Sequence, residues 1–209
     1  AFVYFLTQMK TVKDQYRSAV SVSAVVVGIA GYHYFRIWSD FGEMKMNEGY
    51  RYADWLITVP LLIIELLIVL GVSTDLRKKL MTGLLPATVL MIGLGYPGEV
   101  SSSTGTKWLF WFLAMVPFVY ILRTLYGQLK SAAERETPAV SAAIRNATIV
   151  LLGTWMVYPL AYLFPVFDGD SGTLETLRQV AYTFADITAK GLYGLMIVGI
   201  AKARSASDA

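Results

Sequence analysis

A carboxylate and an amine stand in the middle of the apolar segment 180–200. Asp186 and Lys190 are four residues apart, so both side chains would project from one face of a helix. The segment is about 20 residues long, which is enough to span a bilayer as a helix. Ionisable groups at that depth are costly and usually functional, and a buried lysine can form a Schiff base with a carbonyl cofactor. Asp186 would then be its counter-ion; an ion pair that only stabilises packing is the structural alternative.

A second set of ionisable residues lies in the apolar stretch 51–65. Asp54 and Thr58 are one helical turn apart on one face, and Glu65 follows Asp54 by three turns, roughly 16 Å along the axis. Arg51 precedes Asp54 by three residues and can lie beside it. Such a graded row of proton-binding groups is typical of a vectorial proton relay. Alternatively, Arg51 and Glu65 only extend to opposite membrane surfaces, although Asp54 is too short to reach water.

Two further features have ordinary structural explanations when taken alone. The residues Trp155, Tyr158, Pro159 and Tyr162 share one helix face, where Pro159 would kink the helix and free a backbone carbonyl. Aromatic residues at this spacing are usually part of the core. The single histidine, His33, lies in an apolar span, where a histidine is more often a hydrogen-bonded core residue than a functional one.

The composition indicates a polytopic helical membrane protein. The chain has 209 residues, 56% of them hydrophobic, and a mean hydropathy of +0.52. Its apolar runs are long and continuous rather than alternating, which argues against a β-barrel. Without cysteines, the chain has no disulfides or thiolate metal sites, and one histidine argues against a His-rich metal centre. We therefore expect no metal site.

The pattern of apolar runs predicts an all-α membrane protein, a seven-transmembrane-helix bundle that forms a single domain over 1–209. The expected helices are 1–9 (partial), 14–38, 47–72, 76–96, 105–128, 138–164 and 172–203. The first is expected to be only the cytoplasmic end of a helix whose beginning is absent from this chain; a short interfacial segment is the alternative. No cleavable signal peptide is recognised at the start.

The charges between the spans predict the orientation in the membrane. Most basic residues fall on one side, in these positions: Lys10, Lys13, Arg17, Arg77, Lys78, Lys79, Lys130, Arg135, Lys202 and Arg204. The opposite side combines a few cations with many acids: Lys45, Lys107 and Arg178 with Asp40, Glu43, Glu48, Glu99, Asp168 and Asp170. The positive-inside rule then predicts a cell-membrane protein with its N-terminus outside and its C-terminus in the cytoplasm.

The run Arg-Tyr-x-Asp-Trp-Leu-x-Thr-Val-Pro-Leu from Arg51, with Glu65 downstream, resembles the third helix of proteorhodopsins and xanthorhodopsin-like proteins. Asp-Ile-Thr-Ala-Lys at 186–190 resembles the retinal-attachment helix of the same microbial rhodopsins. The resemblance implies a light-driven outward proton pump, not an enzyme, with all-trans retinal on Lys190 as a Schiff base. Asp54 would be the proton acceptor and Glu65 the cytoplasmic donor. Thr58 would hydrogen-bond near the acceptor, and Arg51 would orient charge on the release side.

The same resemblance implies further site residues. His33 would lie beside Asp54 and couple to its titration. Tyr52 is expected to hydrogen-bond near Asp186. The residues expected to bind retinal are Lys190, Tyr52, Trp55, Leu62, Met91, Gly95, Trp111, Phe118, Trp155, Tyr158, Pro159 and Tyr162. They would form a long apolar slot with one charged end.

Two positions qualify the resemblance. Leu62 falls where proteorhodopsins carry leucine or glutamine, and the apolar residue is similar to the green-absorbing type. Trp111 falls where carotenoid-binding xanthorhodopsins have a glycine; a tryptophan should close that window, which argues against a carotenoid antenna. The alternatives are a photosensory or slow-cycling protein of the same fold, or a retinal-free receptor or scaffold. The expected partners are the lipid bilayer, protons and further copies of the chain in a homo-oligomer, with no nucleic acid.

Overall fold

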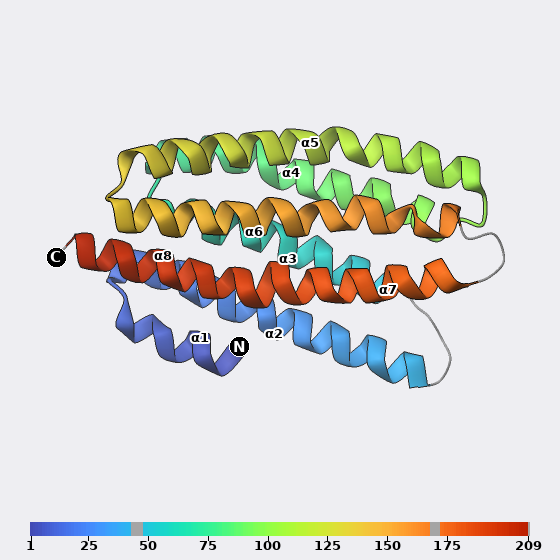
Figure 1. Cartoon of the computed structure of the whole chain (residues 1–209), viewed down its shortest axis with the longest axis horizontal. Helices are drawn as coiled ribbons and strands as arrows, with labels where there is room; N and C mark the ends of the chain where they lie inside the picture. The colour runs from blue at the N-terminus through green and yellow to red at the C-terminus, as the bar shows by residue number, and fades with distance from the viewer. Residues whose placement is uncertain (43–47, 168–171, 209) are drawn as a thin grey trace.

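The computed structural model describes residues 1–42, 48–167 and 172–208, and its regular elements over these ranges are all helical (Figure 1). Side chains of residues 40–42 are not described. The elements are α1 (Phe2–Gln8), η1 (Met9–Thr11), α2 (Asp14–Gly42), α3 (Glu48–Val69), α4 (Thr74–Glu99), α5 (Thr104–Arg135), α6 (Pro138–Tyr162), η2 (Phe164–Val166), α7 (Thr173–Asp186), η3 (Ile187–Leu192) and α8 (Tyr193–Ser207). The segment η3 is a π-helix, and α7, η3 and α8 form one continuous rod.

The long helices run along the long axis of a single bundle, and α1 is a short helix beside α2 (Figure 1). Six helical segments in the described ranges are long and apolar enough to cross a membrane: Asp14–Ser39, Glu48–Val69, Thr74–Glu99, Thr104–Arg135, Pro138–Val166 and Thr173–Ser207. A helix satisfies its own backbone hydrogen bonds, which a bilayer interior requires. The predicted fold class, an all-α multi-pass bundle, is confirmed.

Two helices extend beyond their predicted bounds of 76–96 and 105–128 into charged residues. Residues 75–79 form the first turns of α4, which Ser73 caps by accepting the Leu76 N–H at 3.3 Å. Residues 130–135 continue α5 to its end at Arg135. These ends lie outside the most apolar part of each helix, where water can solvate lysine, arginine and glutamate, which are good helix formers. Pro138 opens α6 in its first turn, as its position in the sequence predicts.

The connections form two sets at opposite ends of the bundle. The α1–α2, α3–α4 and α5–α6 connections and the C-terminus gather at one end (Figure 1). This is the end that carries the basic residues predicted to be cytoplasmic, so the structure brings those residues together. On the opposite side, the predicted charges at residues 40, 43, 45, 168 and 170 lie outside the described residues or side chains.

The surface and the interior of the bundle both suit a bilayer. Large apolar side chains are exposed on the outside of α2 and α5, including Tyr32, Trp38, Phe112 and Val116. The α3 helix and the α7–η3–α8 rod are the most enclosed of the spans. They carry the predicted site residues Asp54 and Lys190 and hold them away from both water and lipid.

Candidate functional site: a buried lysine beside an apolar cavity

Lys190 is buried between two carboxylates. Its Nζ donates to Asp54 Oδ2 at 2.6 Å and lies 2.7 Å from Asp186 Oδ1. All three side chains are at most 3% exposed. Lys190 and Asp186 come from the α7–η3–α8 rod and Asp54 from α3, so two helices assemble the group. The structure thus brings these three ionisable residues together in the interior of the bundle.

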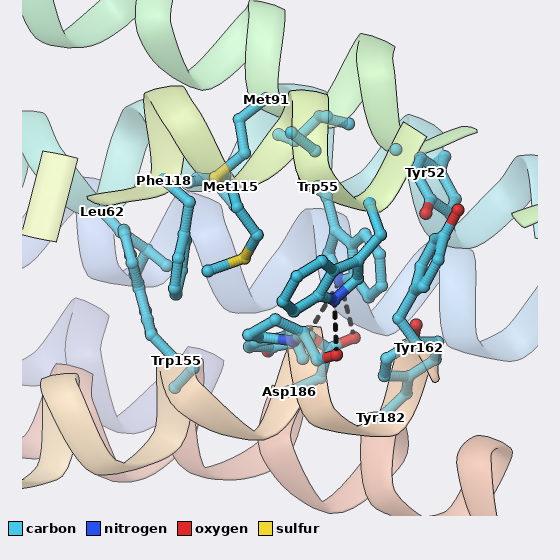
Figure 2. A pocket seen from close by; sticks show the side chains of 18 of the residues that line it. Tyr52, Trp55, Leu62, Met91, Met115, Phe118, Trp155, Tyr162, Tyr182 and Asp186 are labelled. Carbon is cyan, nitrogen blue, oxygen red and sulfur yellow. Dashed lines mark hydrogen bonds between the residues drawn. The ribbon is translucent and has the colours of Figure 1, made fainter. Parts of the chain in front are cut away.

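Asp186 is held by hydrogen bonds from three helices. Tyr34 Oη donates to Oδ2 at 2.5 Å, and Tyr158 Oη donates to Oδ1 at 2.6 Å. Trp55 Nε1 donates to the same carboxylate at 3.0 Å, as the dashed lines in Figure 2 show. Donors to both oxygens stabilise the ionised carboxylate and fix its orientation. Asp186 is thus a firmly positioned anion.

Asp54 is less tightly held. Thr58 Oγ1 donates to the Asp54 backbone carbonyl at 2.8 Å and lies 3.4 Å from Oδ2. His33 Nδ1 lies 3.6 Å from Oδ1, which has no hydrogen-bond partner within the described part of the chain. His33 also lies 3.1 Å from the Ile29 carbonyl. The structure therefore places Thr58 and His33 around Asp54, with one carboxylate oxygen left open.

An elongated apolar cavity runs past Lys190 (Figure 2). The empty space along it is about 780 Å³, which includes open solvent at its mouth. Leu62, Phe118 and Trp155 lie toward one end, and Tyr52, Tyr162 and Tyr182 toward the other (Figure 2). Every residue expected to bind retinal lines this cavity, and the lining also includes Val59, Ile92, Ala114, Met115, Tyr182, Asp186 and Ala189.

Tyr52 lines the cavity, but the prediction that it hydrogen-bonds near Asp186 is wrong. Its hydroxyl donates to Glu99 Oε2 at 3.1 Å, and Tyr182 donates to the same oxygen at 3.2 Å. Tyr52 reaches from α3 toward the end of α4, whereas Tyr34 and Tyr158 occupy the side of Asp186.

The sequence suggested that Glu99 and Arg178 are charges in the connections between spans, but the structure places both in helices. Both are buried, and Arg178 Nη1 lies 2.5 Å from Glu99 Oε1. Arg178 also contacts Glu175 at 2.6 Å and Glu48 at 3.4 Å. Each residue stands near a helix end, where sequence position alone does not distinguish a solvated side chain from one that turns inward.

Trp111 and Pro159 are connected across the cavity wall. Trp111 Nε1 donates to the Pro159 carbonyl at 2.9 Å. That carbonyl lies in the last turn of α6, where carbonyls lack intrahelical partners. The indole therefore joins α5 to α6 and fills the wall at the position where a glycine would leave space.

Arg51 is buried rather than extended to the membrane surface. Only 2% of its side chain is exposed; it donates to Tyr34 Oη at 2.7 Å and to Gln179 Oε1 at 2.9 Å. Its Nη1 lies 3.8 Å from Asp186 Oδ2. Arg51 thus faces the Asp186 side of the site rather than Asp54, with Tyr34 between the guanidinium and the carboxylate.

Glu65 is also fully buried, so the alternative of a surface carboxylate is wrong. Ser23 Oγ donates to Glu65 Oε2 at 2.7 Å, and Glu65 Oε1 has no partner in the described residues. No cation neutralises it in any ion pair of the described residues. A carboxyl group buried without a cation favours its neutral form.

Several residues that hydrogen-bond to the buried carboxylates were not predicted from the sequence. Tyr34, Tyr182 and Ser23 hold Asp186, Glu99 and Glu65 respectively. Tyr34 adjoins His33, and its position in an apolar span was the one available signal.

The fold and the site define a multi-pass membrane protein with a buried, doubly paired lysine facing an apolar cavity. A family model described as bacteriorhodopsin-like protein matches residues 1–203. The chain therefore belongs to the bacteriorhodopsin-like family, a family of light-driven ion pumps, which are transporters and not enzymes.

Individual relatives agree with this assignment. The green-light absorbing proteorhodopsin of Gamma-proteobacterium EBAC31A08 is 31% identical over 209 residues, covering 98% of this chain and 82% of the relative. Xanthorhodopsin, described as a light-driven ion pump with dual chromophore, has a TM-score of 0.91 at 43% identity, covering 99% of this chain and 88% of that one. A thermophilic rhodopsin has a TM-score of 0.93 at 37% identity with the same coverage. The predicted resemblance to proteorhodopsins and xanthorhodopsin is confirmed.

Proposed function

We propose that this chain binds all-trans retinal at Lys190 and moves protons out of the cell under light. The observation that carries the proposal is the position of Lys190 Nζ, which borders the apolar cavity and lies between Asp54 and Asp186 at 2.6 and 2.7 Å. A lysine amine forms a covalent bond with a carbonyl carbon. Two carboxylates beside the nitrogen would stabilise its positive charge once that bond has formed.

The cavity fits a long apolar chromophore. Its walls are aromatic and aliphatic, with the polar groups at the lysine, and this combination suits an elongated polyene that carries one reactive carbonyl. Retinal bound as a protonated Schiff base supplies light absorption and a light-induced isomerisation. Trp55, Tyr158 and Trp155 come from two helices and would keep the chromophore aligned.

The two carboxylates beside Lys190 would have different roles. Asp186 has donors on both oxygens, so we infer that it stays ionised and orients the nitrogen. Asp54 has an open Oδ1 and lies 2.6 Å from the nitrogen through Oδ2, so we infer that it accepts the proton. His33 beside Asp54 Oδ1 would adjust the charge of the acceptor.

Glu65 would return a proton to the Lys190 nitrogen from the other side. It lies on α3 three turns beyond Asp54, roughly 16 Å along the helix. Its burial without a cation would keep a proton available, and Ser23 would hold one oxygen in place. Toward the opposite end, Arg51 and Tyr34 would respond to the change of charge at the carboxylates.

The direction of transport follows from the end of the bundle that we assign to the cytoplasm. The end nearer Glu65 carries the basic connections and the C-terminus, and we infer that it faces the cytoplasm by the positive-inside rule. Protons would then enter past Glu65 and leave past Arg51. Trp111 fills the cavity wall, so we do not expect a second chromophore of the kind named for xanthorhodopsin.

The first test is colour. Purified protein supplied with all-trans retinal should absorb visible light, and hydroxylamine should bleach it in light because it attacks the bond to Lys190. A protein that stays colourless with retinal present contradicts the proposal and leaves a retinal-free receptor as the alternative.

A further inference from the structure

Two buried oxygen atoms between the lysine and the end of the bundle lack hydrogen bonds. Glu65 Oε1 and Tyr193 Oη are buried, and neither has a partner among the residues that the structure describes. Both side chains are 0% exposed. Buried polar groups in proteins are nearly always paired, either with protein atoms or with buried water. Two unpaired oxygens in one region therefore indicate a shared third partner.

Tyr193 stands on the route from Lys190 to Glu65. It is the first residue of α8 and follows Lys190 by three positions in the same rod, about 4.5 Å further along the axis. This advance is toward the bundle end nearer Glu65. The rod thus places a phenol beyond the lysine on the side from which Glu65 would supply protons.

The neighbouring residue shows how close this turn of α8 lies to Glu65. A Cβ atom added to Gly194 would lie 3.4 Å from the Ser23 Cβ, and Ser23 Oγ is the donor to Glu65 Oε2. The first turn of α8, which carries Tyr193, therefore lies beside the Ser23–Glu65 hydrogen bond, where α2, α3 and α8 meet.

Several side chains near Tyr193 and Glu65 cannot bind or pass on a proton. Leu62, Leu66 and Ile197 are buried apolar side chains within about one helical turn of Glu65 or Tyr193 along their own helices. A phenol hydroxyl can donate one hydrogen bond and accept another at the same time, which the aliphatic side chains cannot. A water held between Tyr193 Oη and Glu65 Oε1 would satisfy both atoms.

We propose that Tyr193 is a positioning residue for proton return, holding with its hydroxyl a buried water that is shared with Glu65 Oε1. This inference rests on the proposed function and deepens it, because it names a residue between the donor and the lysine. The water would orient the Glu65 carboxyl toward Lys190 and shorten the gap that a proton must cross.

The direct test is the infrared carboxyl stretch of Glu65 in the dark. The band is identified by its loss in Glu65→Gln, and Tyr193→Phe removes only the hydroxyl. We expect Tyr193→Phe to shift this band because the carboxyl changes its hydrogen bonding. Tyr16→Phe is the matched control: its hydroxyl donates to Asp208 at 2.9 Å near the end of the bundle. It should leave the band in place.

The kinetic test follows the recovery of absorbance after a flash. Tyr193→Phe should slow the Glu65-dependent phase roughly 3- to 10-fold, the factor that one hydrogen bond supplies. In a Glu65→Gln background the same change should have no further effect. Equal slowing in both backgrounds, or a shifted dark colour, would indicate a packing role and overturn the inference.

The infrared comparison needs neither light nor retinal, so it separates this inference from the proposed function. An unmoved Glu65 band in Tyr193→Phe overturns the role of Tyr193 even if the protein pumps. A moved band supports the shared water even if retinal does not bind. A protein that forms no pigment contradicts only the proposed function.

Discussion

Lys190 Nζ lies 2.6 Å from Asp54 Oδ2, although the two residues are 136 positions apart in the chain. The contact exists because α3 packs directly against α8 of the α7–η3–α8 rod in the enclosed middle of the bundle. The same nitrogen lies 2.7 Å from Asp186, whose two oxygens are already held by Tyr34, Tyr158 and Trp55. The two carboxylates are therefore inequivalent before any light is absorbed, and this difference is the reason for proposing Asp54 as the proton acceptor.

Replacing Lys190 by alanine should give a folded, colourless protein. The bundle can tolerate the loss of the amine, but among the described residues no other lysine lines the cavity. Lys202→Ala, which changes an exposed lysine of the same rod, should keep the colour. Absorption spectra after addition of retinal make the comparison. Visible absorption that persisted in Lys190→Ala and resisted washing would contradict the attachment site.

Replacing Asp54 by asparagine should red-shift the dark absorption and abolish transport. A positive charge at the Lys190 nitrogen is then less stabilised in the ground state, so excitation requires less energy. Lowering the pH should red-shift the wild type in the same way as Asp54 takes up a proton, and raising the pH should reverse the shift. A spectrophotometric titration of both proteins gives the result. Wild-type absorption that stayed constant into acid would count against Asp54.

The sequence was informative about the bundle and about the ionisable residues for one physical reason. Membrane-spanning helices need long apolar runs, and charges inside such runs are conspicuous because burial is costly. Asp54, Glu65 and Lys190 could therefore be selected without a structure. The ends of the spans were less certain because solvated helix ends such as 130–135 carry the same residues as loops.

The partners of those residues could not be selected in the same way. Tyrosine and serine are ordinary in membrane helices, so nothing in the sequence favoured Tyr34 as the donor to Asp186 or Ser23 as the donor to Glu65. Their roles depend on how each helix is rotated about its axis, which is set by packing between helices. Tyr52 illustrates the point, because it lines the predicted cavity but bonds to Glu99 on α4.

Replacing Arg178 by glutamine should destabilise the protein strongly. It removes the cation 2.5 Å from buried Glu99, and breaking one side of a buried ion pair costs about 3–5 kcal/mol. Thermal loss of colour should occur at lower temperature. The double variant Arg178→Gln with Glu99→Gln should recover part of the loss because position 99 no longer holds a buried charge without its cation. An unchanged Tm in Arg178→Gln would show that the pair contributes little.

Replacing Glu65 by glutamine should slow the recovery after a flash without changing the dark colour. Glu65 does not line the cavity, and a positioned acid contributes roughly 10²-fold or more to the rate of proton transfer. Recovery should become pH-dependent, slower at higher pH, because protons then come from bulk water. Azide should restore the rate.

Glu134→Gln is the matched control for this measurement, because it changes an exposed carboxylate at the basic end of the bundle. It should recover at the wild-type rate. If Glu65→Gln also matched wild type at every pH, Glu65 would not be the donor, and the argument for direction would rest on loop charges alone.

The measurement closest to the central claim is the light-induced pH change of a weakly buffered suspension of cells that express the chain and are supplied with retinal. Illumination should acidify the medium. A protonophore should abolish the change, and Lys190→Ala cells should show none. Coloured cells whose medium stayed constant, or became alkaline in light, would contradict an outward proton pump.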